Sequence, residues 1–487
     1  MPALIETSLM PRRIRFWHEE AQSARIPRPR ISESPWPNLS TNPTGHLIGL
    51  VVGGFGLIHN VAMSAESPWQ SRAINSPDRQ PSEIAAQNSA STLAGARGPV
   101  WLFSPAVDIA AFLGSAVVSL GLLAVGWSAG WLNQDTPDWT WVSFILLVDV
   151  AHVYATGFRV YFVPGEFSRR PWVYGLAPAL GFIIGLAVYS ESEVYFWRGL
   201  AYLAVFHFVR QQYGWVALYR ARAGEQGQLG RWIDTIAIYL ATVFPLVYWH
   251  AHLPRNFWWF LEGDFANLPL TAARVLEPIY WLALSAYFAR SLHNGFRHRF
   301  WNPGKDIVVA TTALCWYLGI VAVNSDYAFT VTNVIIHGVP YLVLVYWYRF
   351  VRTADDARDT NGSKLNQTEL TKHLDQEVGA RQDASSHQNA TPNQEDGVKS
   401  GRWRRHAQTV VMFLGAVWLL AYAEELLWDR GIWHERSWLF GSQWELGNWR
   451  IVLVPLLAVP QLTHYILDGF IWRRRSNPEL NAITNVD

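Results

Sequence analysis

The sequence has little charge for its length. Only 16% of its 487 residues are Asp, Glu, Lys or Arg, whereas a soluble globular domain has ~25%. Half of the residues are hydrophobic, and 27 of them are tryptophan. Trp and Tyr rings are stable at the ends of membrane-spanning helices, where they lie among the lipid headgroups. The composition therefore favours an integral membrane protein over a soluble one.

Other scarce features exclude further classes. The single cysteine, Cys315, lies in an apolar run and has no second cysteine with which to form an intramolecular disulfide, so cysteine usage does not report the redox compartment. The net charge of +1 gives no general electrostatic attraction to nucleic acid. The sequence also has no Walker loop, Gly-rich dinucleotide turn or Ser-nucleophile elbow.

Long apolar runs are what the chain does have. From about Ala106 onward they recur with ~20 residues each, enough to cross a ~30 Å hydrocarbon core. We expect an all-α, polytopic membrane bundle of about ten transmembrane helices, at residues 107–127, 139–163, 172–190, 194–219, 232–250, 274–292, 306–324, 327–350, 407–428 and 449–472.

The loops between these spans alternate in charge. Arg169 and Arg170 follow the second span, and Arg473 follows the tenth, whereas 133–138 and 324–326 carry no positive residue. Because short cytoplasmic loops collect Lys and Arg, the alternation supports this assignment of spans. It predicts a multi-pass protein of the cell inner membrane with both termini in the cytoplasm.

Some segments lie outside the expected bundle, whose two parts are 100–351 and 406–475. Residues 1–99 form an Arg- and Pro-rich extension with one apolar stretch near 47–61, which is either a signal-like segment or an extra helix. Alternatively, translation begins at Met63 and residues 1–62 are not native. Residues 352–405 are polar and almost free of aromatics, which is typical of a disordered linker. Residues 476–487 form a cytoplasmic tail.

Four of the expected helices carry polar pairs at membrane depth, where polar side chains are costly and are functional candidates. The two members of each pair are three or four residues apart and so share a helix face. The histidines lie ~10–15 residues from the outer helix ends, which is ~15–22 Å deep at 1.5 Å per residue. We therefore expect a shared pocket formed by four pairs, Asp149 with His152, His207 with Gln211, Asn333 with His337, and His464 with Asp468.

Imidazole and carboxylate together suit iron, zinc, copper or manganese. We expect the four histidines, Asp149 and Asp468 to bind one or two ions, with iron as the favoured metal. The amides of Gln211 and Asn333 would support the ligands by fixing their ring tautomers. Taken singly, each histidine could instead serve as a hydrogen bond between helices.

Three more residues extend the candidate site. Tyr341 lies four residues after His337 and could donate a hydrogen bond during catalysis. Arg159 and Arg210 could bind a lipid phosphate or a carboxylate substrate below the metal. The alternative is that they reach out to the headgroups, which we favour for Arg159, or pair with Asp468.

One fragment carries a resemblance. Residues His464 to Asp468 resemble the His-x-x-x-Asp element of the bacterial β-carotene-cleaving (Brp/Blh-type) membrane oxygenases. The likeness covers one helix, and Gly469 stands where that family has a further histidine. The clustered histidine boxes of membrane fatty-acid desaturases are absent. No residue role is carried over from either family.

These observations predict a membrane-embedded, non-haem metal-dependent oxidoreductase acting on an apolar, lipid-like or isoprenoid substrate. One alternative is a transporter or channel that passes protons, metal ions or a small anion through the same polar layer. Another is a haem protein with two of the histidines as axial ligands. The expected partners are membrane lipids.

Overall fold

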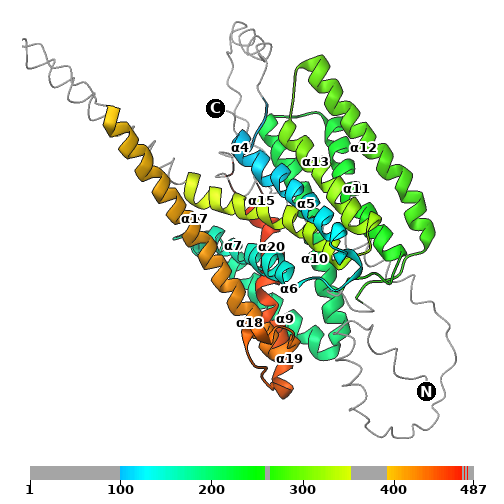
Figure 1. The fold of residues 1–487 in the computed structure, drawn as a ribbon, viewed down its shortest axis with the longest axis vertical. Helices are drawn as coiled ribbons and strands as arrows, with labels where there is room; N and C mark the ends of the chain where they lie inside the picture. Colours follow the sequence, from blue (N-terminus) through cyan, green and yellow to red (C-terminus); the bar gives the residue numbers. More distant parts are fainter. Residues whose placement is uncertain (1–98, 258–263, 353–391, 474–476, 478–479, 481–487) are drawn as a thin grey trace, which may run out of the picture. The chain divides into compact units, whose positions relative to one another are not determined.

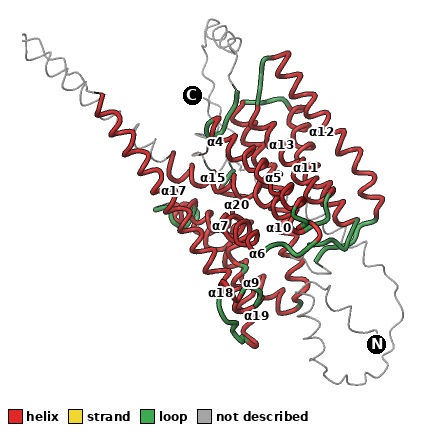
Figure 2. The backbone as a smooth tube through the Cα atoms, in the orientation of Figure 1, coloured by secondary structure: helices red, strands yellow, loops and turns green. Residues whose placement is uncertain are grey.

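The computed structural model describes residues 99–487, except 258–263, 353–391, 474–476, 478–479 and 481–487. These described residues form helices, turns and loops with no β-strand (Figures 1 and 2). The expected all-α class is therefore confirmed. The N-terminal extension and its apolar stretch at 47–61 lie outside the described residues.

Eight helical segments are long and apolar enough to cross a membrane. In a bilayer the backbone must satisfy its own hydrogen bonds, and a helix does so within one segment. The first four are α4 (Pro105–Asp108), η2 (Ile109–Gly114) and α5 (Ser115–Ser128); α6 (Asp138–Thr140), η4 (Trp141–Val150) and α7 (Ala151–Arg159); α9 (Pro171–Glu191); and α11 (Gln228–Ala251).

The other four segments follow the same rule. They are α13 (Pro303–Trp316) with η5 (Tyr317–Ala322); α14 (Asp326–Phe329), η6 (Thr330–Val334), α15 (Ile335–Tyr346) and η7 (Trp347–Val351); α17 (Pro392–Trp428), from His406 onward, with η8 (Asp429–Trp433); and η9 (Gly447–Trp449), α19 (Arg450–Leu457) and α20 (Val459–Ile471). Short helices η3 (Trp131–Asn133), α8 (Glu166–Arg169) and α18 (Ser437–Phe440) lie in the connections.

The remaining two expected spans, 194–219 and 274–292, are also helical. They lie in α10 (Glu193–Ala223) and α12 (Leu270–His298), which have 31 and 29 residues. Neither is among the segments apolar enough to count as a membrane span. Charged and amide residues such as Arg210, Gln211 and Arg290 lower their average hydropathy. Eight candidate spans are thus present in the described chain, and ten remain a prediction.

Two local features fix helix ends near the candidate site. Gly224 ends α10 with a left-handed backbone (φ 67°), a conformation that costs glycine nothing. The tenth expected span is divided at Ala458 into α19 and α20. Pro460, in the first turn of α20, has no N–H to continue the hydrogen bonds of α19.

The helices form two neighbouring groups joined through α10 and α15 (Figure 1). In one group, α11 packs on α12 and α13, with α5 beside α13. In the other, α7 packs on α17 and α20, and α9 packs on α19 and α20. Helix α10 contacts both α11 and α20, and α15 contacts both α5 and α7. The four helices that carry the candidate histidines therefore meet where the two groups join.

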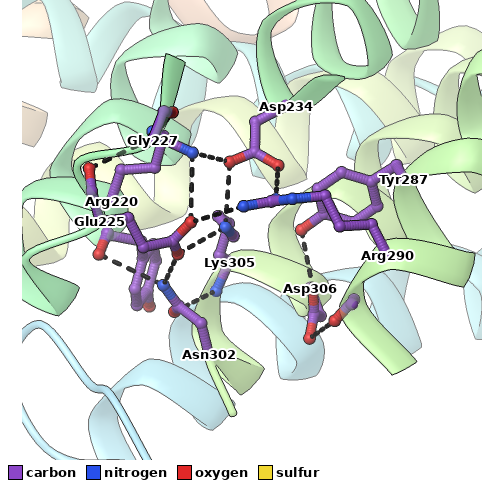
Figure 3. Close-up of polar contacts among 11 residues, drawn as sticks. Arg220, Glu225, Gly227, Asp234, Tyr287, Arg290, Asn302, Lys305 and Asp306 are labelled. Carbon is purple, nitrogen blue, oxygen red and sulfur yellow. Dashed lines mark hydrogen bonds and ion pairs between the residues drawn. The ribbon is translucent and has the colours of Figure 1, made fainter. Parts of the chain in front are cut away.

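A buried network of charged residues ties α10 to α11, α12 and α13 (Figure 3). Asp234 is fully buried and accepts from Arg220, from Arg290 at 3.0 Å and from Lys305 at 3.0 Å. Glu225 accepts from Lys305 at 2.6 Å and from Arg220 at 3.1 Å. Burial alone would raise the pKa of Glu225, but Lys305, Asn302 and Arg220 together hold that pKa below its usual range.

Two expected boundaries need adjustment. Helix α17 already begins at Pro392, inside the segment expected to be a disordered linker. The rest of that segment, 353–391, lies outside the described residues. In the expected tail, Asn477 and Leu480 are fully buried. Asn477 donates to the carbonyls of Phe470 and Arg473, and these bonds fold that residue back onto the end of α20.

Candidate metal centre

The four candidate histidines converge at the centre of the described helices. His152 comes from α7, His207 from α10, His337 from α15 and His464 from α20. All four side chains are buried, with residue exposures between 1% and 4%. The structure thus brings the four predicted histidines close together.

The imidazoles meet through their Nε2 atoms. The Nε2 atoms of His152 and His337 are 3.1 Å apart, and those of His207 and His464 are 3.0 Å apart. Two nitrogens bound to one ion at 2.0–2.1 Å lie about 2.9–3.4 Å apart for bond angles between 90° and tetrahedral. Each pair therefore has the spacing of neighbouring ligands on a single ion.

The four rings also form a closed quadrilateral. Its sides, measured between ring centroids, are 4.7 Å (152–337), 5.1 Å (337–207), 4.5 Å (207–464) and 4.8 Å (464–152). The 152–207 diagonal is 6.2 Å. Imidazoles on one ion have centroids about 4.5–5.2 Å apart when adjacent and about 6.4 Å when opposite, by the same bond lengths. The arrangement brings four imidazoles together, and ligand atoms of His152, His207 and His464 lie within 4.8 Å of one another, while His337 groups with His152 and Asp149.

The two carboxylates lie behind the rings, on the side of Nδ1. Asp149 Oδ1 is 3.6 Å from His152 Nδ1. Asp468 lies 3.8 Å from His207 Nδ1 through Oδ2 and 3.9 Å from His464 Nδ1 through Oδ1. Carboxylates in this place commonly orient a metal-binding histidine and raise its basicity. Groups of possible ligand atoms within 4.8 Å of one another are His152, His207 and His464, and Asp149, His152 and His337.

A chain of hydrogen bonds connects Asp468 to His464 through two hydroxyl groups. Tyr341 Oη donates to Asp468 Oδ1 at 2.6 Å. Thr156 Oγ1 lies 2.9 Å from Tyr341 Oη and 2.7 Å from His464 Nδ1. The expected site residue Tyr341 is therefore in the cluster, although its part in catalysis remains a prediction.

Several buried polar atoms of the cluster have no hydrogen-bond partner among the described residues. They are Asp149 Oδ1, His152 Nδ1, His337 Nδ1, Gln211 Oε1 and Asn333 Oδ1. A buried polar atom without a partner costs roughly 1–3 kcal/mol. This concentration of unpaired acceptors and imidazole nitrogens suits a cation and its surrounding ligands. It is the second observation, beside the ring spacing, that fits a bound metal ion.

The two amides lie beside the cluster. Gln211 Nε2 donates to the backbone carbonyl of His337 at 2.7 Å and so ties α10 to α15 at the site. Asn333 donates to Thr332 Oγ1 at 3.0 Å within its own helix. The Gln211 side chain also interacts with the His207 ring. Their support of the metal ligands remains a prediction.

The two arginines do not join the hydrogen bonds of the cluster. Arg210 is exposed, donates to Tyr239 Oη and has its guanidinium 5.0 Å from the ring of Tyr213. Arg159 is fully buried, and its Nη1 is 3.0 Å from Glu166 Oε1. The expectation that Arg159 reaches out to the headgroups is therefore wrong, because a buried carboxylate neutralises it. Substrate or lipid binding by either arginine remains a prediction.

Aromatic residues that the sequence did not single out as site residues complete the surroundings. The Phe208 ring lies 3.8 Å from that of His337, and the Tyr465 ring stacks on His207 at 4.8 Å. Each follows a candidate histidine by one residue. Because neighbouring residues lie on different faces of a helix, this spacing does not predict a contact with the site.

Gly338 follows His337 in α15 and lies against a neighbouring helical segment. A Cβ on Gly338 would lie 2.6 Å from Val148 Cγ1. Gly338 thus permits close packing against η4, the segment that carries Asp149.

Comparison with known proteins gives no match. No protein-family model matches the chain, and neither a curated protein nor a solved structure matches it. The function is therefore argued from the site itself.

Proposed function

We propose that this protein is a membrane-embedded, non-haem metal-dependent oxidoreductase that acts on a lipid or isoprenoid substrate. The observation that carries the proposal is the quadrilateral of four buried imidazoles, with Nε2 separations of 3.0 and 3.1 Å. These separations, and the group formed by the ligand atoms of His152, His207 and His464, support an ion held by imidazole nitrogens. Iron is the ion we favour, and once bound it would supply dioxygen chemistry that side chains cannot perform.

The residues of this chain would then have distinct tasks. His152, His207, His337 and His464 hold the ion. Asp149 and Asp468, predicted as ligands, lie on the Nδ1 sides and would balance the charge of the ion and orient the rings. Phe208 and Tyr465 cover rings of the cluster and keep water away from it. Since Asp149 and Asp468 side chains are 24% and 12% exposed, approach to the centre would pass beside them.

The apolar substrate class is supported by the setting of the cluster. It lies in segments long and apolar enough to cross a membrane, including Asp138–Arg159 and Asp326–Val351. Around it the helices present exposed apolar side chains such as Ile466 and Phe470 of α20. A substrate dissolved in the bilayer could reach such a centre without entering water.

The ring spacing makes the haem alternative less favourable. Two axial imidazole nitrogens lie about 4 Å apart with a flat porphyrin between them. Here the nitrogens of each pair are closer, and the rings of the other pair stand at right angles beside them, as His337 does to His207 (89°). The geometry supports a metal ion bound directly by side chains rather than a haem.

Metal content of the purified protein tests the proposal. We expect about one iron per chain in the wild type, and almost none in His207→Ala. The control is His293→Ala, which replaces an exposed histidine and should keep its metal. The loaded wild type should consume dioxygen when supplied with native lipid extract, and His207→Ala should not. A wild type without stoichiometric metal would end the proposal, and Asp149-dependent ion uptake by proteoliposomes would favour the transporter.

A further inference from the structure

The hydrogen-bond chain behind His464 determines which of its nitrogens faces the centre. It joins three helices, α7 through Thr156, α15 through Tyr341 and α20 through His464 and Asp468. Thr156 and Tyr341 are buried, with exposures of 3% and 1%. These two hydroxyl groups are therefore shielded from water and find their hydrogen-bond partners within the protein.

The direction of each bond follows from counting hydrogens. The single hydroxyl hydrogen of Tyr341 goes to Asp468 Oδ1, so the Tyr341 oxygen is an acceptor toward Thr156. The single hydroxyl hydrogen of Thr156 is then used toward Tyr341. Thr156 Oγ1 must accept from His464 Nδ1, 2.7 Å away. His464 therefore carries its proton on Nδ1, and its Nε2 presents a lone pair toward His207.

The carboxylate of Asp468 cannot do this alone. Although it is one helical turn from His464, its Oδ1 lies 3.9 Å from Nδ1, which is too far for a hydrogen bond. Its other oxygen is directed to His207 Nδ1 at 3.8 Å. Thr156 and Tyr341 instead connect the Asp468 carboxylate to His464 Nδ1 through hydrogen bonds. One carboxylate thus lies behind two of the four imidazoles.

We propose that Thr156 is a positioning residue of the metal centre, which fixes His464 in the tautomer whose Nε2 binds the ion. This inference rests on the proposed metal centre and deepens it. Thr156 touches neither the ion nor the substrate. It acts through His464, as partners behind metal-binding histidines commonly do.

Titration of the metal-free protein with Co(II), followed by its visible spectrum, tests this role. Thr156→Val keeps the shape of the side chain and removes the hydroxyl. It should weaken Co(II) binding by about 10- to 100-fold and shift the visible bands, the usual effect of losing such a partner. Thr156→Ser should restore both affinity and spectrum, and Tyr341→Phe should weaken binding by less than Thr156→Val does.

Thr242→Val is the matched control. Thr242 is fully buried in α11 and bonds only carbonyls of its own helix, so its loss should leave the Co(II) spectrum unchanged. The proposal is overturned if Thr156→Val binds Co(II) like the wild type, or if Thr156→Ser is as weak as Thr156→Val. A wild type that binds no Co(II), iron or zinc contradicts the metal centre itself, which is a different outcome.

Discussion

Two buried polar clusters in the described part of the chain, the charged network and the histidine cluster, differ in how completely their atoms are paired. In the charged network around Asp234, every buried side-chain nitrogen and oxygen of Arg220, Glu225, Arg290 and Lys305 has a partner. In the histidine cluster, two ring nitrogens and three acceptor oxygens have none among the described residues. A fully paired network stabilises the fold by itself, whereas an unpaired one is completed by something it binds.

The two clusters also lie at different places along the helices. The charged network uses Glu225 between α10 and α11, and Lys305 in the first turn of α13. The histidine cluster uses residues in the interior of longer helical segments, such as Asp138–Arg159 and Asp326–Val351. Helix α10 contributes to both, with Arg220 near one end and His207 near its middle. The same helix thus serves stability at its end and, by our proposal, chemistry in its interior.

Asp234→Asn should have the largest effect on stability. It would leave Arg220, Arg290 and Lys305 around a neutral amide, and breaking a buried ion pair costs about 3–5 kcal/mol. Unfolding in mixed micelles, followed by circular dichroism, measures this loss, with exposed Asp135→Asn as the control. Metal content per folded chain should not change. A decrease in the free energy of unfolding below about 1 kcal/mol would mean that the charged network does not stabilise the fold in the way described here.

Gly338→Ala should have an intermediate effect and lower both the stability of the fold and the metal affinity of the site. The added Cβ would meet Val148 at 2.6 Å, and overpacking of this kind costs about 1–3 kcal/mol. Since η4 would have to move with Asp149, metal affinity should fall as well. Gly214→Ala in α10, where a Cβ meets nothing within 4 Å, should be neutral or slightly stabilising. Equal melting temperatures for both variants would contradict the close packing described here.

His337→Leu should separate stability from binding. It replaces the imidazole by an apolar group of similar volume. This removes an unpaired Nδ1, which favours folding, and the hydrogen bond to His152 Nε2, whose loss opposes it. We expect the metal-free variant to unfold with a free energy within about 1 kcal/mol of that of the wild type, while metal binding is lost. A loss as large as that of Asp234→Asn would show that the histidine cluster stabilises the fold in the same way.

The smallest effect is the pH dependence carried by Glu225. Its pKa is held below the usual range in the folded protein, so the unfolded state binds protons first as the pH falls. The contribution of Glu225 is therefore complete above its unfolded pKa of about 4.3. It disappears as the pH drops through the lower folded value. The stability difference between wild type and Glu225→Gln should be constant from pH 7 to 5 and shrink below that; a difference that grows on acidification has the wrong sign.

The helical class and the four polar pairs could be predicted from the sequence, because apolar length and spacings of three or four residues are local properties. The average hydropathy does not identify α10 as a membrane span, because its site residues His207 and Gln211 lower that average. The carboxylate partner of Arg159 could not be foreseen, since Glu166 reaches it only after the chain turns. The hydrogen-bond chain from Asp468 to His464 joins residues of three helices. Residue spacing along a single helix cannot predict such contacts.

X-ray absorption at the iron edge of the loaded protein tests the central claim most directly. We predict about four nitrogen ligands at about 2.0–2.2 Å, with the outer-sphere pattern of several imidazoles and no metal–metal scattering. His464→Ala should lower the imidazole count. A first shell dominated by carboxylate oxygen, or one with fewer than three imidazoles, would contradict a centre built from His152, His207, His337 and His464.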